Sequence, residues 1–319
     1  MEVTRKSVGI VLPVYNEEQG ISYFHKELSA VLNQLGNYDF SIIYVVDRCR
    51  DNSLKILETI SEQDDRVTVL GLSRRFGHQM SLVAGLDACT NDACIMMDCD
   101  LEHPPSLIPT LLRKWEDGFE IVHTKRNYPK SIGFFKRYFS KLFYRCLNKL
   151  TSEDFGESTA DFRLISKSVV QVFQNEIREH NQFLRGLFRW VGFRQTEVSF
   201  DASIRKYGKS NYNMRSLIRF ASSGIVSFSK APLKMSVILG ISMAILGILY
   251  ALFNIVMYFS GQILPAGWTT MVTLMLIIGG MILFMLGIVG EYISAIFDEV
   301  KNRPLYIIQS RYGKMNKGE

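Results

Sequence analysis

The sequence predicts an α/β fold, with a mainly parallel sheet covered by helices on both faces and a C-terminal hairpin of two transmembrane helices. Two observations lead to this prediction. Short β-rich runs alternate with segments of helical spacing in the first part of the chain, which is typical of βαβ units. The stretch 235–290 contains no Asp, Glu, Lys or Arg. The chain is 47% hydrophobic and 21% charged, with a formal net charge of +6, which excludes a disordered or collagen-like protein.

Strands and helices are expected in strict alternation. The β-rich runs are residues 7–14, 40–47, 66–72, 93–98 and 120–124, and the segments with helical spacing are 17–35, 51–63, 77–88 and 104–115. Pro104 and Pro105 suit the first turn of the last helix. Ligands of such sheets bind beyond the carboxyl ends of the strands, so we expect the chemistry in the loops that follow them.

The uncharged stretch divides at residues 260–267 into two segments, each long enough to cross a hydrocarbon core of about 20 helical residues. The alternative, two buried helices of a soluble core, rarely runs this long without a charge. Basic residues flank the stretch on both sides, whereas the connecting turn has none. These are Arg215, Arg219, Lys230 and Lys234 before it, and Lys301, Arg303, Arg311 and Lys314 after it. Both termini are therefore expected in the cytoplasm, at an inner membrane.

These patterns divide the chain into four segments. A large cytoplasmic domain (1–212) precedes an amphipathic juxtamembrane segment (213–234), two transmembrane helices (235–290) and a cytoplasmic tail (291–319). Apolar residues recur at helical spacing beside basic ones in 131–150 and in 213–230. This pattern favours helices in the lipid headgroup region or, alternatively, core-facing helices with a solvated face. The five cysteines form no CxxC pair and are expected to be reduced thiols, with no structural zinc site.

The loops after the strands carry carboxylates in place of glycine-rich nucleotide motifs. Neither GxGxxG nor a Walker lysine loop occurs in them, which disfavours a dinucleotide oxidoreductase or a P-loop NTPase. Asp98 and Asp100 follow an apolar run, and side chains two apart on extended backbone point the same way. Paired hard oxygen ligands suit Mg²⁺ or Mn²⁺, which keeps further positions for water and a diphosphate. The alternative is that Asp100 caps the helix beginning at Pro104 or lies in a solvated turn.

Several motifs follow one another over nearly the whole chain. They are PVYNEE at 13–18, a D-x-x-x-D-x-S loop at 47–53, LSRRFGHQ at 72–79, MMDCDLEHPP at 96–105, ADFRLISK at 160–167, FLRGLFRWVGF at 183–193, YGKSNY at 207–212 and GEYISAIFDEVKNRPLYII at 290–308. In this order they resemble the polyprenyl-phosphate glycosyltransferases of glycosyltransferase family 2. That group includes bactoprenol glucosyltransferases and is related to dolichol-phosphate mannose synthase.

The resemblance implies a GT-A fold and a glycosyltransferase that inverts the anomeric carbon. It would pass one sugar from a UDP- or GDP-linked donor to a polyisoprenyl phosphate, with undecaprenyl phosphate as the expected acceptor, at the cytoplasmic membrane face. By similarity, the nucleotide pocket is lined by Pro13, Tyr15, Asn16, Glu17 and Asp47. The catalytic carboxylates are Asp98 and Asp100, which would hold the donor and its metal with help from Glu102, and Asp161 near the acceptor. Candidates for the donor or acceptor phosphates are Arg126, Arg137, Arg163, Arg205, Lys209, Ser210 and Tyr212.

The acceptor needs little help from a base, because a phosphate monoester has a second pKa of about 6 and is already largely anionic at neutral pH. We therefore expect Asp161 to orient the acceptor, bind metal or support Arg163, and a simple salt bridge with Arg163 is the alternative. The stretch Val46–Cys49 departs from the family's usual Asp-Asp-Gly-Ser. The nucleotide base therefore stays open, and Arg48 either occupies the pocket or reaches the diphosphate.

Two other functions stay open from the sequence. One is a membrane-anchored sugar-nucleotide or lipid-phosphate binding protein without turnover. The other is a processive polysaccharide synthase, although glycine stands at 186, where a Q-x-x-R-W motif needs glutamine, and two spans are few for a polymer channel. We expect membrane lipid and no nucleic acid as a partner, and a homo-oligomer stays open.

Overall fold

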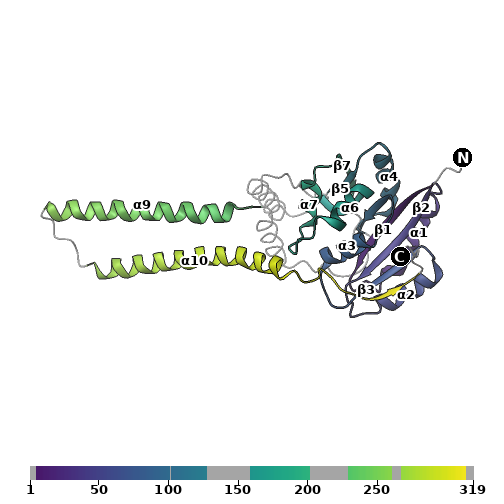
Figure 1. Cartoon of the computed structure of the whole chain (residues 1–319), viewed down its shortest axis with the longest axis horizontal. Helices are drawn as coiled ribbons and strands as arrows, with labels where there is room; N and C mark the ends of the chain where they lie inside the picture. The colour runs from purple at the N-terminus through teal and green to yellow at the C-terminus, as the bar shows by residue number, and fades with distance from the viewer. Residues whose placement is uncertain (1–4, 101, 128–158, 202–228, 261–266, 314–319) are drawn as a thin grey trace.

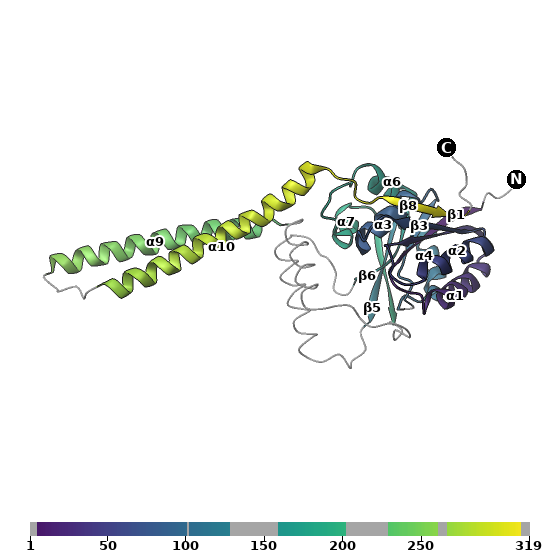
Figure 2. The same cartoon turned by 90° about the horizontal axis from the view of Figure 1, so that it is seen from below.

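The computed structural model describes residues 5–100, 102–127, 159–201, 229–260 and 267–313. Figure 1 shows a layered α/β domain from which two long helices project side by side, and Figure 2 shows the same arrangement after a quarter turn. The segment 131–150 and most of 213–230 lie outside the described residues, as do Arg137, Arg205, Lys209, Ser210 and Tyr212.

The described residues form an eight-stranded sheet in the order β7-β5-β6-β4-β1-β2-β3-β8. The strands are β1 Lys6–Val14, β2 Tyr38–Val46, β3 Val67–Leu72, β4 Ala93–Met96, β5 Ile121–Asn127, β6 Thr159–Ser166, β7 Gln195–Asp201 and β8 Ile308–Tyr312. β1 pairs in parallel with β2 and β4, β2 with β3, and β5 with β7. β6 is antiparallel to both β4 and β5, and β8 is antiparallel to β3. The mainly parallel sheet is confirmed, and its antiparallel strands were not predicted.

Six helices of the described residues cover the two faces of the sheet. On one face lie α1 Ile21–Asn33, α2 Ser53–Gln63 and α4 Ile108–Glu116, and on the other α3 His78–Asp87, α6 Lys167–Asn175 and α7 Leu184–Trp190. Successive side chains of a strand point to opposite faces. Accordingly, Ile10 and Leu12 of β1 join the first core cluster, whereas Val11 between them joins the second. This double coverage explains why the central strands are almost continuously apolar.

The predicted strands and helices up to β5 are confirmed within a few residues, but β4 is shorter than predicted. It ends at Met96, so Asp98 and Asp100 lie in the turn that follows. The two carboxylates therefore belong to a turn and, contrary to the prediction, do not alternate along extended backbone. A short 3₁₀ turn, η1 Pro105–Leu107, then leads into α4.

The two projecting helices are α9 Ala231–Phe259 and α10 Trp268–Lys301. Their spans Ala231–Met257 and Thr270–Lys301 have hydropathies of 2.3 and 2.7, and almost none of these residues is buried inside the protein. Leu276, for example, exposes 72% of its surface. Helices of a soluble core bury such side chains, so this surface favours a membrane over water.

The chain returns to the sheet after the second helix. α10 continues past residue 290 to Lys301, and β8 then closes the sheet edge beside β3. His180 contacts both the Glu299 side chain and the Arg303 carbonyl, and Tyr306 donates a hydrogen bond to Asp87 at 2.7 Å. The segment expected as a cytoplasmic tail, 291–319, therefore includes the end of α10 and an edge strand.

Candidate active site

The loops after β2 and β3 are joined by Asp47. Its two carboxylate oxygens accept hydrogen bonds from the backbone N–H groups of Phe76 at 2.6 Å and Gly77 at 2.9 Å. Only 3% of Asp47 is exposed. The carboxylate, predicted to line the nucleotide pocket, therefore fastens the loop that leads into α3.

The loop after β1 is tied to the loop after β2 by reciprocal hydrogen bonds. The backbone N–H of Asn16 donates to Cys49 Sγ at 3.2 Å, and Asn16 Oδ1 accepts from the backbone N–H of Arg50 at 2.9 Å. Asn16 adopts a φ of 57°, a left-handed conformation that asparagine tolerates better than most residues. The Tyr15 ring lies 4.1 Å from the Arg75 guanidinium. The predicted nucleotide residues after β1 therefore gather at one sheet edge beside Asp47.

Two further sequence positions near this edge have defined contacts. Arg48, left open between the pocket and a diphosphate, donates from Nη1 to the Ser73 carbonyl at 2.6 Å. It thereby bridges the loops after β2 and β3. Pro13 is buried at the end of β1, where its carbonyl accepts a hydrogen bond from Cys99 Sγ at 3.4 Å.

The turn after β4 presents the Asp98 and Asp100 carboxylates. The Asp98 backbone N–H donates to His103 Nδ1 at 2.9 Å, and Asp100 Oδ1 accepts from the Glu102 N–H at 3.0 Å. His103 is 1% exposed, and burial lowers its pKa to about 4, so it is a neutral acceptor here. Desolvation raises the pKa of both aspartates, and repulsion from neighbouring carboxylates adds to the effect.

This turn fits a divalent cation through Asp98 and Asp100. Among the residues that the structure describes, no group of three His, Cys, Asp or Glu side chains is arranged to hold a metal ion. Mg²⁺ commonly uses only one or two protein carboxylates and takes its remaining oxygens from water and phosphates. A cation would also relieve the repulsion within the pair. Glu102, predicted to assist in holding the metal, forms an ion pair with Arg126, a predicted phosphate ligand, at 2.8 Å.

Asp161, on β6, is surrounded by basic side chains. Arg185 of α7 binds it in a bidentate manner, with Nε to Oδ1 at 2.8 Å and Nη2 to Oδ2 at 2.7 Å. Arg163 Nη2 also donates to Oδ1, at 3.2 Å. Burial opposes ionisation, but the charge and hydrogen bonds of Arg185 and His78 hold the pKa of Asp161 well below its usual range. An ionised carboxylate held this way is a poor proton acceptor.

Arg163 requires a correction. It was predicted as a phosphate ligand, but its side chain is 0% exposed and its guanidinium lies 4.5 Å from the centre of the Phe188 ring. A phosphate cannot reach a side chain that is enclosed in the core. Arg163 therefore contacts Asp161 from within the core, and the salt bridge between them, the alternative named from the sequence, exists beside the bidentate one from Arg185.

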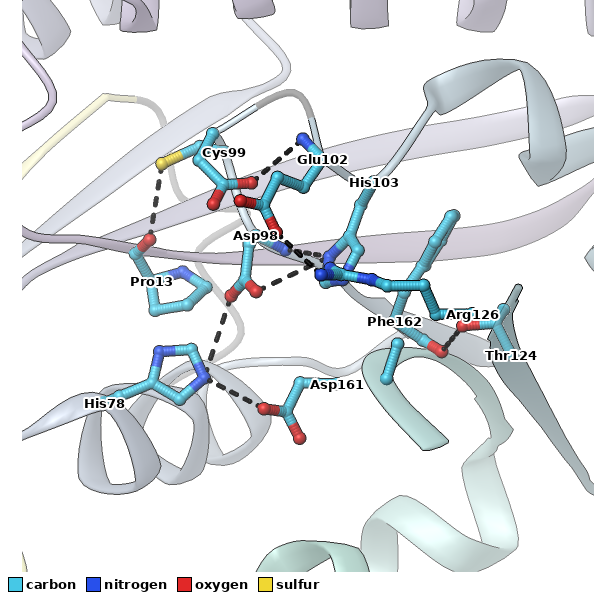
Figure 3. Close-up of polar contacts among 12 residues, drawn as sticks. Pro13, His78, Asp98, Cys99, Glu102, His103, Thr124, Arg126, Asp161 and Phe162 are labelled. Atoms are coloured by element: carbon cyan, nitrogen blue, oxygen red, sulfur yellow. Dashed lines mark hydrogen bonds and ion pairs between the residues drawn. The ribbon is translucent and has the colours of Figure 1, made fainter. Parts of the chain in front are cut away.

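His78 lies between the two acidic positions, as Figure 3 shows. Its Nε2 is 3.7 Å from Asp98 Oδ1 and 3.5 Å from Asp161 Oδ2. Desolvation lowers the pKa of His78, but the two carboxylates outweigh it and raise this pKa to about 9. The ring is therefore protonated at neutral pH and lies between the two carboxyl groups, and 41% of the side chain faces the solvent.

Three residues of this site were not predicted: His78, His103 and Arg185. His78 and Arg185 lie within recognised motifs, GHQ and FLRG, but neither motif by itself indicates a contact with Asp161. Arg185 is 24 residues from Asp161 in the sequence, a separation with no periodic signal. His103 follows the acidic turn directly, and its burial becomes evident only in the folded chain.

Comparisons with known proteins agree with the fold and with the motifs. Residues 9–173 match the family glycosyl transferase family 2, and residues 231–296 match the GtrB C-terminal hairpin. The uncharacterized glycosyltransferase YkcC of Bacillus subtilis (strain 168) is 37% identical over 97% of this chain and 95% of its own length. The bactoprenol glucosyl transferase of Shigella phage SfX is 34% identical over 95% of this chain and 99% of its own length. A solved mycobacterial protein shares the fold with a TM-score of 0.50 at 16% identity, over 69% of this chain and 73% of that chain.

Proposed function

Since the chain belongs to glycosyl transferase family 2 and is a glycosyltransferase with a GT-A fold, we propose that its substrates are a nucleotide-diphosphate sugar and a polyisoprenyl phosphate. One sugar passes from the first to the second, with inversion at the anomeric carbon. The observation that carries this proposal is the convergence of Asp98, Asp161 and His78 at the carboxyl edge of the sheet, beside the nucleotide-side loops. A relative of nearly equal length is named for transfer to bactoprenol.

We assign one group of residues to the donor and another to the acceptor. Tyr15, Asn16 and Glu17 receive the nucleoside, and the turn of Asp98 and Asp100 faces the diphosphate. Asp98 and Asp100 would hold Mg²⁺ or Mn²⁺, which would supply positive charge to the leaving diphosphate. Asp161 orients the acceptor side, because its ion pairs leave it ionised and unsuited to accepting a proton. The acceptor phosphate is itself anionic and attacks without a strong base.

The hairpin accounts for access to a lipid acceptor. Its apolar surface associates the protein with a membrane, and α10 returns the chain directly to the sheet. We place the domain and both termini on the cytoplasmic side of an inner membrane, where the basic flanks of the spans favour it. On this side the domain meets the soluble nucleotide sugar, and the lipid phosphate emerges beside it.

The experiment incubates membranes containing the full-length protein with undecaprenyl phosphate, Mn²⁺ or Mg²⁺, and a panel of UDP- and GDP-linked sugars. The lipid product is identified by mass. A lipid carrying one sugar supports the proposal. Donor that binds without being consumed supports a binding protein, and a ladder of lengthening chains supports a polymerase. Membranes with the Asp98→Asn variant are the matched control, since they contain the same fold and anchor.

A further inference from the structure

We infer that His78 is a positioning residue, which fixes the donor-side carboxylate of Asp98 relative to the acceptor-side carboxylate of Asp161. This inference rests on the proposed function, because it assigns those two carboxylates to the two substrates. The observation behind it is geometric. A single atom, Nε2 of His78, lies within 3.7 Å of Asp98 and 3.5 Å of Asp161.

Asp98 lies in the turn after β4, and Asp161 lies on β6, the strand next to β4 in the sheet. β4 and β6 are antiparallel partners in which Met96 pairs with Arg163, so the turn after β4 lies beside the start of β6. Two anions on adjacent strands repel each other unless a donor or cation lies between them. The His78 ring occupies that place and comes from a third element, α3.

The backbone that carries His78 is held firmly in place. Asp47 accepts hydrogen bonds from the backbone N–H groups of Phe76 and Gly77, the two residues before His78. Gly77 has a φ of 99°, a conformation that glycine adopts without strain, and it turns the chain into α3. Residues 81–86 of that helix are buried in the core. The position of the ring is therefore set by β2, the loop after β3 and the sheet together.

The acceptor-side carboxylate, Asp161, is held by a second helix, α7. Arg185, at the start of α7, binds Asp161 through two hydrogen bonds. The residues next to His78 and Arg185 are joined as well, since the Leu184 N–H donates to Gln79 Oε1 at 3.3 Å. The first turns of α3 and α7 are thus joined to each other, and both contact Asp161. His78 also contacts Asp98.

This arrangement predicts a loss of turnover without a comparable loss of donor binding. The nucleoside is received by the loops after β1 and β2, whereas the ion pairs of His78 are formed with Asp98 and Asp161. Misplacing reacting groups by about 1 Å can reduce a rate about 100-fold. We therefore expect His78→Ala to lower kcat about 100-fold while the donor KM changes only a few-fold.

The test uses full-length protein in membranes and compares His78→Ala, His78→Gln, Asp161→Asn and the double variant His78→Ala/Asp161→Asn. His78→Gln keeps a donor of similar reach and is expected to recover part of kcat. If His78 acts through Asp161, the double variant is about as slow as the slower single variant. His25→Ala is the matched control. His25 lies on α1, where its Nδ1 is 3.1 Å from the Tyr44 hydroxyl, and the variant is expected to retain kcat.

Several results would overturn the inference. They are an unchanged kcat in His78→Ala, losses that multiply in the double variant, or a fall in kcat that merely follows a fall in Tm. If wild-type protein does not glycosylate undecaprenyl phosphate but hydrolyses the nucleotide sugar, the proposed function fails by itself. The same variants are then compared by hydrolysis, since Asp98 serves the donor in both reactions. A wild-type protein without any turnover would overturn both statements.

Discussion

The sheet domain and the hairpin place the same residue types in opposite surroundings. In the sheet, Leu164 and Val69 are completely buried, whereas Leu276 and Leu283 of α10 expose 72% and 71% of their surface. A domain that buries its apolar surface in its own core is stabilised by water on the outside. The described residues of the hairpin leave their apolar side chains exposed, and such a surface favours a membrane over water. The two regions of the chain therefore favour different surroundings.

The distribution of charge follows the same division. The stretch 235–290 has no acidic or basic residue, whereas ionisable groups concentrate at the carboxyl edge of the sheet. Charges are tolerated there because they are paired: the buried Asp161 with Arg185, and the partly buried Glu102 with Arg126. The apolar hairpin and the charged edge of the sheet are therefore separate regions of the chain.

The largest expected effect comes from substitutions at the sheet edge, which leave the hairpin intact. Asp98→Asn or Asp100→Asn keeps the shape of the turn but removes charge that would hold a cation, so transfer should fall at least about 100-fold. Membrane association should stay unchanged, because the hairpin is intact. The measurement is the initial rate of sugar transfer in membranes, with the protein level determined by immunoblot. Transfer by the wild-type protein in excess chelator would contradict the metal role.

The next effect compares one substitution in both regions. Leu164→Ala removes a fully buried side chain from β6 and should cost about 2–5 kcal/mol of unfolding free energy. Leu276→Ala, made on the exposed surface of α10, should leave the stability of the sheet domain nearly unchanged. Thermal inactivation of detergent-solubilised protein measures both. Equal losses in the two variants would mean that the hairpin is packed against protein.

A charged substitution at the same position tests the hairpin, with Leu276→Ala as the matched control. Leu276→Arg places a cation in the first third of α10, within its uncharged stretch. At the centre of a spanning helix such a charge costs about 2.5–3.5 kcal/mol on insertion. The fraction of protein recovered with membranes should fall, whereas Leu276→Ala should partition like the wild type. Full recovery of the arginine variant would contradict a spanning helix.

The smallest expected effect lies where the two regions meet. The two ring nitrogens of His180 face acceptors, the Arg303 carbonyl at 2.6 Å and Glu299 at 3.1 Å, and this raises the pKa of His180. A raised pKa in the folded state means that the contact contributes fully below about pH 6.5 and is lost as pH rises through the folded value. Amides 299–303 should therefore exchange hydrogen faster at high pH, relative to the intrinsic rate, than at pH 6. His180→Gln should remove this difference, and a variant that retains it would contradict the assignment.

The structure also changes how a truncation experiment should be designed. Removing all residues from 235 onward deletes not only the hairpin but also β8, which pairs with β3, and Tyr306, which bonds to Asp87. Such a protein loses an edge strand together with its anchor. Loss of activity in it would therefore not separate the two regions, whereas substitutions at Leu276 do.

Much of the architecture is predictable because it depends on local patterns. Alternating β-rich and helical segments indicate the parallel core, since each segment shows its own periodicity. Asp98 and Asp100 are identifiable because they directly follow an apolar strand. β6, β7 and β8 were missed, since antiparallel β6 enters the sheet between β4 and β5, and β8 returns only after the hairpin. Nothing in their own sequence specifies those partners.

The sequence by itself determined which segments prefer water and which prefer lipid, and which loops carry carboxylates, because these properties belong to single residues and to their immediate spacing. Only the tertiary structure decided that Arg163 is enclosed, that Arg185 binds Asp161, and that His78 lies between Asp161 and Asp98. Such contacts join groups tens of residues apart. Their geometry exists only after the strands have paired and the helices have packed, when burial and charge select the partners that can coexist.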